Sequence, residues 1–229
     1  MIIVENIDVW GFEHAVRGMR NPLLSHDRSD SRWEWVEDPS PINPDDPGMM
    51  FVVGENDLDL MRRLYRAGTE HRKYLRQIFV SMDITAPLYW WKEMDQYKVG
   101  TVTDSCSKMH KIAAKDFELD DFSHEHLIDY GIGVDKGYSI VPSYLLQATI
   151  DVLNLCRKSY LETKDKKWWW QLIQLLPSSY NQRRTLTMNY ENVVSIIRQR
   201  TGHKLDEWNA FVEVLKDLPY VKEIMDEGA

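Results

Sequence analysis

One segment in the middle of the chain constrains the fold more than any other. Residues 78–85 alternate between apolar and polar side chains, which predicts a half-buried strand whose inner face carries Val80, Met82 and Ile84. Ala86-Pro87 follows, and Pro87 is well placed to open a helix that we expect to reach about Gln96. A polar loop comes next. A strand that leads into a helix and then into a polar loop indicates a domain that contains both sheet and helix.

The rest of the chain predicts more helix than strand. A strand is expected at 3–9, and helices are expected at 12–19, 56–68, 143–163, 168–176, 190–200 and 205–215, with Asn56, Ser143 and Asn189 as N-caps. Residues 21–49 are rich in turn-forming residues and predict a long loop, and 97–140 predict an irregular acidic segment. We therefore expect an α+β fold, as one helix-rich domain over 1–229 with a small, mostly antiparallel sheet.

Composition narrows the classes of ligand. The 28 Lys and Arg residues against 36 Asp and Glu residues give a formal net charge of −8. A chain this acidic is not expected to bind a nucleic acid polymer or an anionic membrane through its overall field. A small anionic ligand would need a local basic pocket. No apolar stretch is long enough to predict a membrane-spanning helix.

Cysteine and histidine usage suggests neither a redox pair nor a metal centre. Cys106 and Cys156 are the two cysteines, and they form no C-x-x-C motif. The segment His124-Glu125-His126 could supply two ligands, but no third ligand is evident, so we expect no metal. The N-terminal residues lack the pattern of a signal peptide, and a cytoplasmic location is the expectation.

The polar loop after the central helix carries the densest set of hydrogen-bonding groups. Such a loop is suited to an anionic ligand, although a solvated surface connection has the same pattern. The groups are Lys98, Thr101, Asp104, Ser105, Cys106, Ser107, Lys108 and His110.

This segment resembles the flavin-dependent thymidylate synthases. Their signature follows an Ala-Pro and reads Arg-His-Arg, two variable residues, Ser, one variable residue, Asn-Glu, one variable residue, Ser, one variable residue, Arg-Tyr. Aligned without gaps from Ala86-Pro87, this chain has Gln96-Tyr97-Lys98, Thr101, Thr103-Asp104, Cys106 and Lys108-Met109 at those positions. A shift of one residue would place Ser107 on the second Ser.

Two flanking segments extend the resemblance. Upstream, the family has a Gly-His after a helix, and this chain has His71 at the matching distance, with Lys73 at a Ser/Thr position and Arg76 at an acidic position. Downstream, the family has Leu-Pro, then Thr-x-Asn, then an Arg eleven residues further on. The matching residues here are Leu176-Pro177, Thr187-Met188-Asn189 and Arg200. Eleven residues are about three helical turns, so Asn189 and Arg200 should lie on one face of one helix.

The resemblance implies a cofactor, substrates and a site. Family members are homotetramers that bind FAD and dUMP, use NADPH and methylenetetrahydrofolate as co-substrates, and need no protein nucleophile. The flavin carries the difficult chemistry. By matched position, the FAD-binding residues would be His71, Lys73, Arg76, Gln96, Tyr97, Lys98 and Asn189. The substrate-binding residues would be Thr101, Asp104, Cys106, Ser107, Lys108 and Arg200.

Because the residues at the signature positions differ from those of the family, three hypotheses are open. The first is a divergent flavin-dependent synthase that methylates a pyrimidine nucleotide, of the kind found in phage or prophage genomes. The second is a nucleotide-binding homo-oligomer that keeps the scaffold but has lost flavin chemistry. It is motivated by four departures from the family pattern, at Gln96, Tyr97, Arg76 and Ile173. The third is a partner-binding protein, suggested by the tryptophan clusters at 90–91 and 168–170, which also suit plain core packing.

Overall fold

The computed structural model describes residues 1–35, 48–105, 111–134 and 138–225. The chain divides into two compact units. Unit 1 comprises Met1–Ile3, Thr85–Met94 and Ser105–Arg184, and unit 2 comprises Val4–Ile84, Asp95–Asp104 and Thr185–Ala229. The prediction of one domain over 1–229 stays a prediction.

A four-stranded sheet has the order β1 (Ile3–Trp10), β4 (Phe79–Pro87), β8 (Asn181–Asn189), β5 (Thr101–Ser105). The strands predicted at 3–9 and 78–85 are therefore confirmed. β4 continues through Pro87, so the prediction that this proline opens the helix is wrong. Helix α3 (Leu88–Met94) begins at the next residue, where the N–H of Leu88 donates to the carbonyl oxygen of Tyr180 at 3.0 Å.

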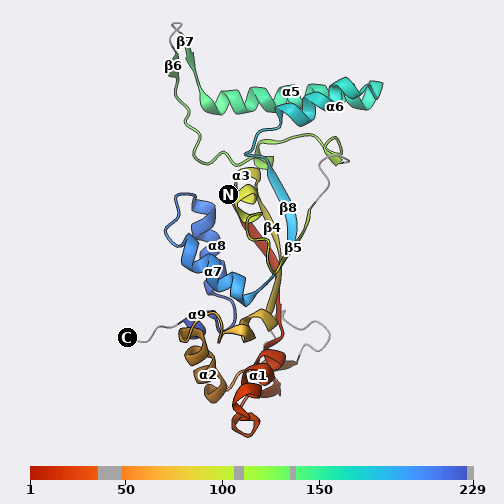
Figure 1. The fold of residues 1–229 in the computed structure, drawn as a ribbon. Helices are drawn as coiled ribbons and strands as arrows, with labels where there is room; N and C mark the ends of the chain where they lie inside the picture. The colour runs from red at the N-terminus through yellow and green to blue at the C-terminus, as the bar shows by residue number, and fades with distance from the viewer. Residues whose placement is uncertain (36–47, 106–110, 135–137, 226–229) are drawn as a thin grey trace. The chain divides into compact units, whose positions relative to one another are not determined.

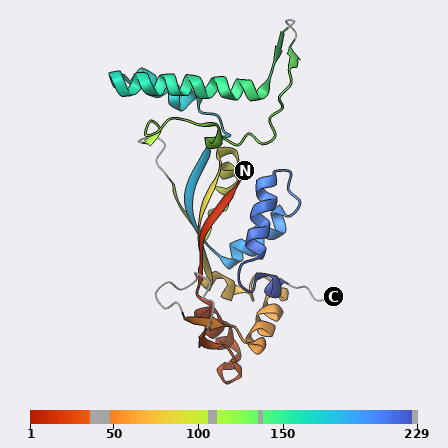
Figure 2. The ribbon, with the colours of Figure 1, turned by 180° about the vertical axis from the view of Figure 1, so that it is seen from behind.

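The buried side chains of unit 2 follow the predicted periodicities. Val80, Met82 and Ile84 of β4 are almost fully buried, as the alternation predicts. Helices α7 (Tyr190–Arg200) and α8 (Asp206–Lys216) match the predicted helices within one residue. Figure 1, and Figure 2 from behind, show α7 and α8 on one side of strands β4 and β8. The helix-rich α+β class with a small sheet is confirmed.

The half-buried side chains that alternate with this core form hydrogen bonds between strands. The Asp83 carboxylate accepts from Thr185 at 2.6 Å and from Asn6 at 2.9 Å. Thr187 donates to Ser81 at 3.1 Å. These polar pairs hold the strands in register, because a shift of one residue would exchange them with the apolar set.

The prediction of a long loop at 21–49 is wrong in part. Short 3₁₀ turns η1 (Asn21–Leu23) and η2 (His26–Arg28) follow α1 (Phe12–Arg20). Strand β2 (Arg32–Trp35) then pairs in antiparallel fashion with β3 (Met49–Val52). The hairpin escaped prediction because its strands have four residues each and β2 alternates tryptophan with charged residues.

A buried ion pair fixes the segment between α1 and α2 (Glu55–Arg66). Arg20 and Asp57 are 4% and 0% exposed, and Arg20 Nε donates to Asp57 Oδ1 at 2.5 Å. The other carboxylate oxygen of Asp57 accepts from the hydroxyls of Ser29 and Ser31 and from two backbone N–H groups. The pair is therefore fully hydrogen-bonded, which a buried charge requires.

The N-cap of α2 is not Asn56, the residue that the sequence predicts. Gly54 is the N-cap residue, and Asn56 is already helical. The carboxylate of Asp30 accepts from the N–H groups of Asn56 and Asp57 at 3.0 and 3.2 Å. The cap thus comes from a residue 26 positions before Asn56, which a local sequence pattern cannot reveal.

Unit 1 is built on two helices that pack on each other, α5 (Pro142–Thr163) and α6 (Lys166–Leu175). Its core contains Leu146, Ile150 and Leu153, with Trp168 and Trp169 packed against it. The apolar stripe of this helix predicts these three and also Tyr160, which is half-buried. α5 begins at Pro142 rather than after a Ser143 cap. Trp90 and Trp91 are fully buried, as core packing predicts, and Trp91 Nε1 donates to the carbonyl oxygen of Gln182 at 2.9 Å.

The remaining elements are short. The segment predicted to be irregular, 97–140, contains β5, η4 (Leu119–Asp121) and the antiparallel pair β6 (Ile132–Val134) and β7 (Tyr138–Ile140). Unit 2 also contains η3 (Lys73–Gln77) and α9 (Val221–Met225). Within the described ranges, no helix combines the length and the hydropathy that crossing a bilayer requires.

Replacing Arg20 by Leu should destabilise the protein by about 3–5 kcal/mol, because Asp57 would keep a buried charge without its cation. Urea unfolding measures this loss. Arg63→Leu is the control, since the Arg63–Asp59 pair is 64% and 57% exposed and should contribute at most about 1 kcal/mol. Equal losses of unfolding free energy in the two variants would contradict the conclusion that the buried pair stabilises the fold more than the exposed pair.

The Asp57 pair also predicts a pH dependence. Burial alone would raise the pKa of Asp57, but hydrogen bonds from Ser31, Ser29 and Arg20 outweigh it and hold the pKa below its ordinary value. The stabilisation is therefore complete above the unfolded-state pKa of about 3.9 and is lost as pH falls through the lower native value. The difference in unfolding free energy between wild type and Asp57→Asn should shrink as pH falls from 6 to about 3. A difference that stays constant or grows would contradict this.

Candidate functional site

The candidate site lies in unit 2, where the turn at 95–100 runs beside helix α7. The turn leads into β5, and α7 follows directly from β8. An eleven-residue helix is about 16 Å long, and hydrogen bonds join the turn to both of its ends. The turn is therefore held along one side of the helix.

At the N-terminal end of α7, two asparagines hold the turn. Asn189 is the N-cap, as predicted, and its Oδ1 accepts from the N–H of Asn192 at 3.1 Å and from Asn192 Nδ2 at 3.2 Å. Asn192 Nδ2 also donates to the carbonyl oxygens of Val99 and Gly100 at 3.0 and 3.2 Å. Gly100 has φ +77°, and a Cβ there would lie 2.5 Å from Asn189 Nδ2. The position therefore requires glycine for both its conformation and its close approach to the cap.

At the C-terminal end of α7, Tyr97 meets Arg200. The Arg200 Nε donates to the Tyr97 hydroxyl at 2.9 Å, and this hydroxyl donates to Gln199 Oε1 at 3.0 Å. Thr101 donates from its hydroxyl to the carbonyl oxygen of Tyr97. The tyrosine is therefore fixed through both its side chain and its backbone.

Aromatic and imidazole groups fix the plane of the Arg200 guanidinium. Its carbon lies 4.4 Å from the centre of the Trp208 ring and 5.6 Å from that of Tyr97. Arg200 Nη1 approaches His203 Nε2 to 3.2 Å, and His203 Nδ1 accepts from the N–H of Leu205. Trp208 is fully buried while Arg200 is half-buried. The cation is thus stacked on a rigid ring with part of its surface open to solvent.

A second ion pair attaches the segment around residue 72 to the first turn of α7. Arg72, which is 8% exposed, donates to both carboxylate oxygens of Glu191, with distances of 2.8 to 3.2 Å. Element η3 packs against α7. The guanidinium of Arg72 is therefore engaged in structure, while His71, Lys73 and Arg76 are exposed beside it.

The structure brings some of the predicted site residues together. Hydrogen bonds join Tyr97 to Thr101 and Arg200, and Asn189 holds the same turn through Asn192. Asn189 and Arg200 stand at the two ends of one helix, as predicted. Gln96, Lys98 and Asp104 are exposed on or just after the same turn. Cys106, Ser107 and Lys108 lie outside the described residues.

Sequence reasoning missed most of the residues that fix Arg200. Gln199, His203 and Trp208 surround it, and Arg72 with Glu191 anchors the neighbouring segment. His203 follows Arg200 by three residues but lies beyond the end of α7, so helical spacing gave no signal for this contact. The Arg72–Glu191 pair spans 119 positions and left no local signal.

The arrangement suits an anionic, partly aromatic ligand. Exposed Lys73, Arg76 and Lys98 supply positive charge near α7 in a chain whose overall charge is negative. The half-buried guanidinium of Arg200 can donate to an oxyanion from a fixed orientation. A group of this kind can hold and orient an anion by hydrogen bonds without a nucleophile.

Comparisons with known proteins establish the fold. Neither a family model nor a curated protein matches this sequence. Among solved structures, the flavin-dependent thymidylate synthase ThyX from Helicobacter pylori, complexed with FAD and dUMP, has a TM-score of 0.64 at 16% identity over 98% of both chains. The UMP/dUMP methylase PolB from Streptomyces cacaoi, bound with 5-Br dUMP, has a TM-score of 0.57 at 14% identity, over 94% of this chain and 88% of that chain.

The chain thus has the fold of nucleotide-modifying enzymes that are similar to it along nearly their whole length. More particularly, it has the fold of the flavin-dependent thymidylate synthases, and the resemblance seen in the sequence is confirmed at the level of fold.

Replacing Gly100 by Ala should destabilise the protein by roughly 1–3 kcal/mol, because the residue would be strained at positive φ and would displace the Asn189 cap. Thermal or urea unfolding measures the loss. Gly202→Ala is the matched control, since Gly202 also has positive φ (+72°) but a Cβ there meets nothing within 4 Å. A loss at Gly100 no larger than that at Gly202 would show that the turn does not depend on the close approach.

Proposed function

We propose that this protein is a divergent flavin-dependent thymidylate synthase that methylates a pyrimidine deoxynucleotide, most simply dUMP to dTMP. Methylenetetrahydrofolate would donate the carbon and NADPH would reduce the flavin. A homotetramer would be the working form. The observation that carries the proposal is the full-length likeness in fold to a ThyX structure, combined with Tyr97, Asn189 and Arg200 along one turn and helix at positions that match the family's motifs.

The residues near α7 fit FAD in charge and in hydrogen-bonding capacity. Lys73, Arg76 and Lys98 are exposed cations that could neutralise a pyrophosphate, while His71, Gln96, Tyr97 and Asn189 could contact the rings and sugar by hydrogen bonds or stacking. Bound FAD would supply the hydride in its reduced form. The part of the protein is to hold these groups in place and to exclude water.

Arg200 is the residue best placed to bind the nucleotide. Its guanidinium is held in one plane by Trp208 and the Tyr97 hydroxyl, so little conformational entropy is lost when it binds an oxyanion. Thr101 and Asp104 lie on β5, which begins at the end of the turn. Cys106, Ser107 and Lys108 remain part of the proposal through the resemblance alone.

One observation favours the alternative, a nucleotide-binding homo-oligomer without flavin chemistry. Tyr97 stands where the family signature has its central His, and its hydroxyl is already bonded to Arg200 and Gln199. Gln96 removes one positive charge from the same turn. A protein with these changes could retain nucleotide binding through Arg200 while its affinity for the flavin falls.

The purified protein, supplied with FAD, should show flavin absorbance bands after gel filtration. It should convert dUMP to dTMP when given methylenetetrahydrofolate and NADPH. Arg200→Leu should weaken dUMP binding by about 10- to 100-fold, because a charge-assisted hydrogen bond contributes about 1.5–3 kcal/mol. Arg63→Leu, an exposed cation on α2, is the control and should leave dUMP binding unchanged.

The outcomes separate the two functions. A protein that takes up no FAD, yet melts at a higher temperature with dUMP, would support the alternative and overturn the synthase proposal. A protein that responds to neither ligand would overturn both.

A further inference from the structure

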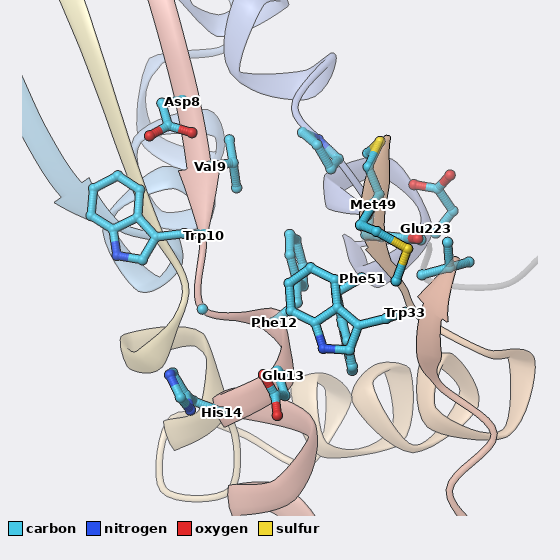
Figure 3. Close-up of a pocket in the computed structure, with 15 residues that line it drawn as sticks. Asp8, Val9, Trp10, Phe12, Glu13, His14, Trp33, Met49, Phe51 and Glu223 are labelled. Atoms are coloured by element: carbon cyan, nitrogen blue, oxygen red, sulfur yellow. The ribbon is translucent and has the colours of Figure 1, made fainter. Parts of the chain in front are cut away.

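A separate cavity of about 650 Å³ lies in unit 2, where β1 passes into α1 (Figure 3). The hairpin β2–β3 and the segment at 219–223 complete its wall. Its lining is mostly apolar and comes from Val9, Trp10, Phe12, Trp33, Met49, Met50, Phe51, Val52, Pro219 and Tyr220. None of the residues of the candidate site at α7 is among them.

Aromatic rings dominate this lining. Phe12 meets Tyr220 edge to face, with ring centres 5.2 Å apart, and Trp33 meets Phe51 at 5.6 Å. Trp10 and Trp33 are 42% and 46% exposed, which is unusual for side chains of this size. Figure 3 shows Trp33 and Phe12 close together, with Trp10 across the open space from them. The cavity therefore offers several ring faces to a ligand.

The polar groups of the cavity are acidic. Asp8, Glu13 and Glu223 line it together with His14, and no Lys or Arg is among the described residues that line it. A phosphate or carboxylate ligand would meet repulsion from these side chains. The cavity is thus opposite in chemistry to the α7 site and is unsuited to FAD or dUMP.

Asp8 is a half-buried lining residue whose carboxylate has unused acceptor capacity. Its Oδ1 is buried and has no hydrogen-bond partner among the described residues. Burial also raises the pKa of this carboxyl. The carboxylate accepts a backbone hydrogen bond from Val9, and a carboxylate has further acceptor sites that a donor on a bound molecule could use.

We propose that this cavity binds a small aromatic molecule that carries an amino or amidino cation. The rings of Phe12, Trp33 and Phe51 would stack on its aromatic part and attract its cation through their faces. Asp8 would accept a charge-assisted hydrogen bond from its N–H group. The volume lies within the range of about 300–1,000 Å³ that is typical of sites for such molecules.

The charge of the ligand can be tested with three probes that share one ring. Tryptamine, tryptophol and indole-3-acetate carry a positive, a neutral and a negative side chain on the same indole. Calorimetric titration of the full chain should show the order tryptamine, then tryptophol, then indole-3-acetate, with tryptamine at least tenfold tighter than the acetate. Equal binding of the three, or tighter binding of the acetate, would overturn the proposal, and so would no binding at all.

Two substitutions locate the site. Asp8→Asn should weaken tryptamine binding about tenfold and leave tryptophol almost unchanged, because only the cation uses the carboxylate charge. Glu5→Gln is the matched control, since it removes the same charge from the same strand at a residue that does not line the cavity. Equal weakening in both variants would indicate a general field effect and overturn the assignment to Asp8. Trp33→Leu should weaken all three probes, and circular dichroism verifies that each variant is folded.

Discussion

The side chains of Asn189 and Asn192 connect β8, α7 and the turn at 95–100 in unit 2. Asn189 ends β8, it caps α7, and it bonds to Asn192, which holds the turn at Val99 and Gly100. The N–H of Tyr190 donates to the carbonyl oxygen of Ile78 at 2.9 Å, so the same point also fixes the start of β4. The position of the turn beside α7, and hence the meeting of Tyr97 with Arg200, depends on this junction. An N-cap is modest in energy, about 1 kcal/mol, but here it also decides geometry.

Unit 2 contains two proposed ligand sites, which prefer ligands of opposite charge. Near α7, exposed cations and a stacked guanidinium suit an anion, although the chain as a whole carries a charge of −8. At the end of β1, carboxylates and aromatic rings suit a cation. Local arrangement rather than net charge therefore decides which ligands each site accepts, because fields from exposed charges are screened within about 10 Å in salt.

The sequence predicts those parts of the fold whose signals are local. α7 was predictable because Asn189 is a capping residue followed by a periodic apolar stripe, and β4 was predictable from strict alternation. β8 was not predicted, since two arginines and two threonines interrupt its apolar positions. The cap of α2 was placed wrongly because Asp30 supplies it from outside the helix. A contact between residues so far apart in the sequence forms only when the chain folds, so no local pattern predicts it.

The same distinction applies to the candidate site. Helical arithmetic predicts that Asn189 and Arg200 share a face, and the structure places them at the two ends of α7, each end bonded to the same turn. The bond between Tyr97 and Arg200 spans 103 positions, and only the resemblance to a family placed both residues at one site. The apolar spacing of the helix at 205–215 places Trp208 on its inner face, and Trp208 is buried. Its stacking on Arg200, however, depends on how α8 packs on α7.

Hydrogen–deuterium exchange with and without FAD and dUMP tests the central claim most directly, which is that the turn beside α7 forms the ligand site. Amides in 95–104 and in 189–203 should exchange more slowly when the ligands are present, whereas amides in α2 should not change. Protection confined to other segments, or no protection at saturating ligand, would contradict the account.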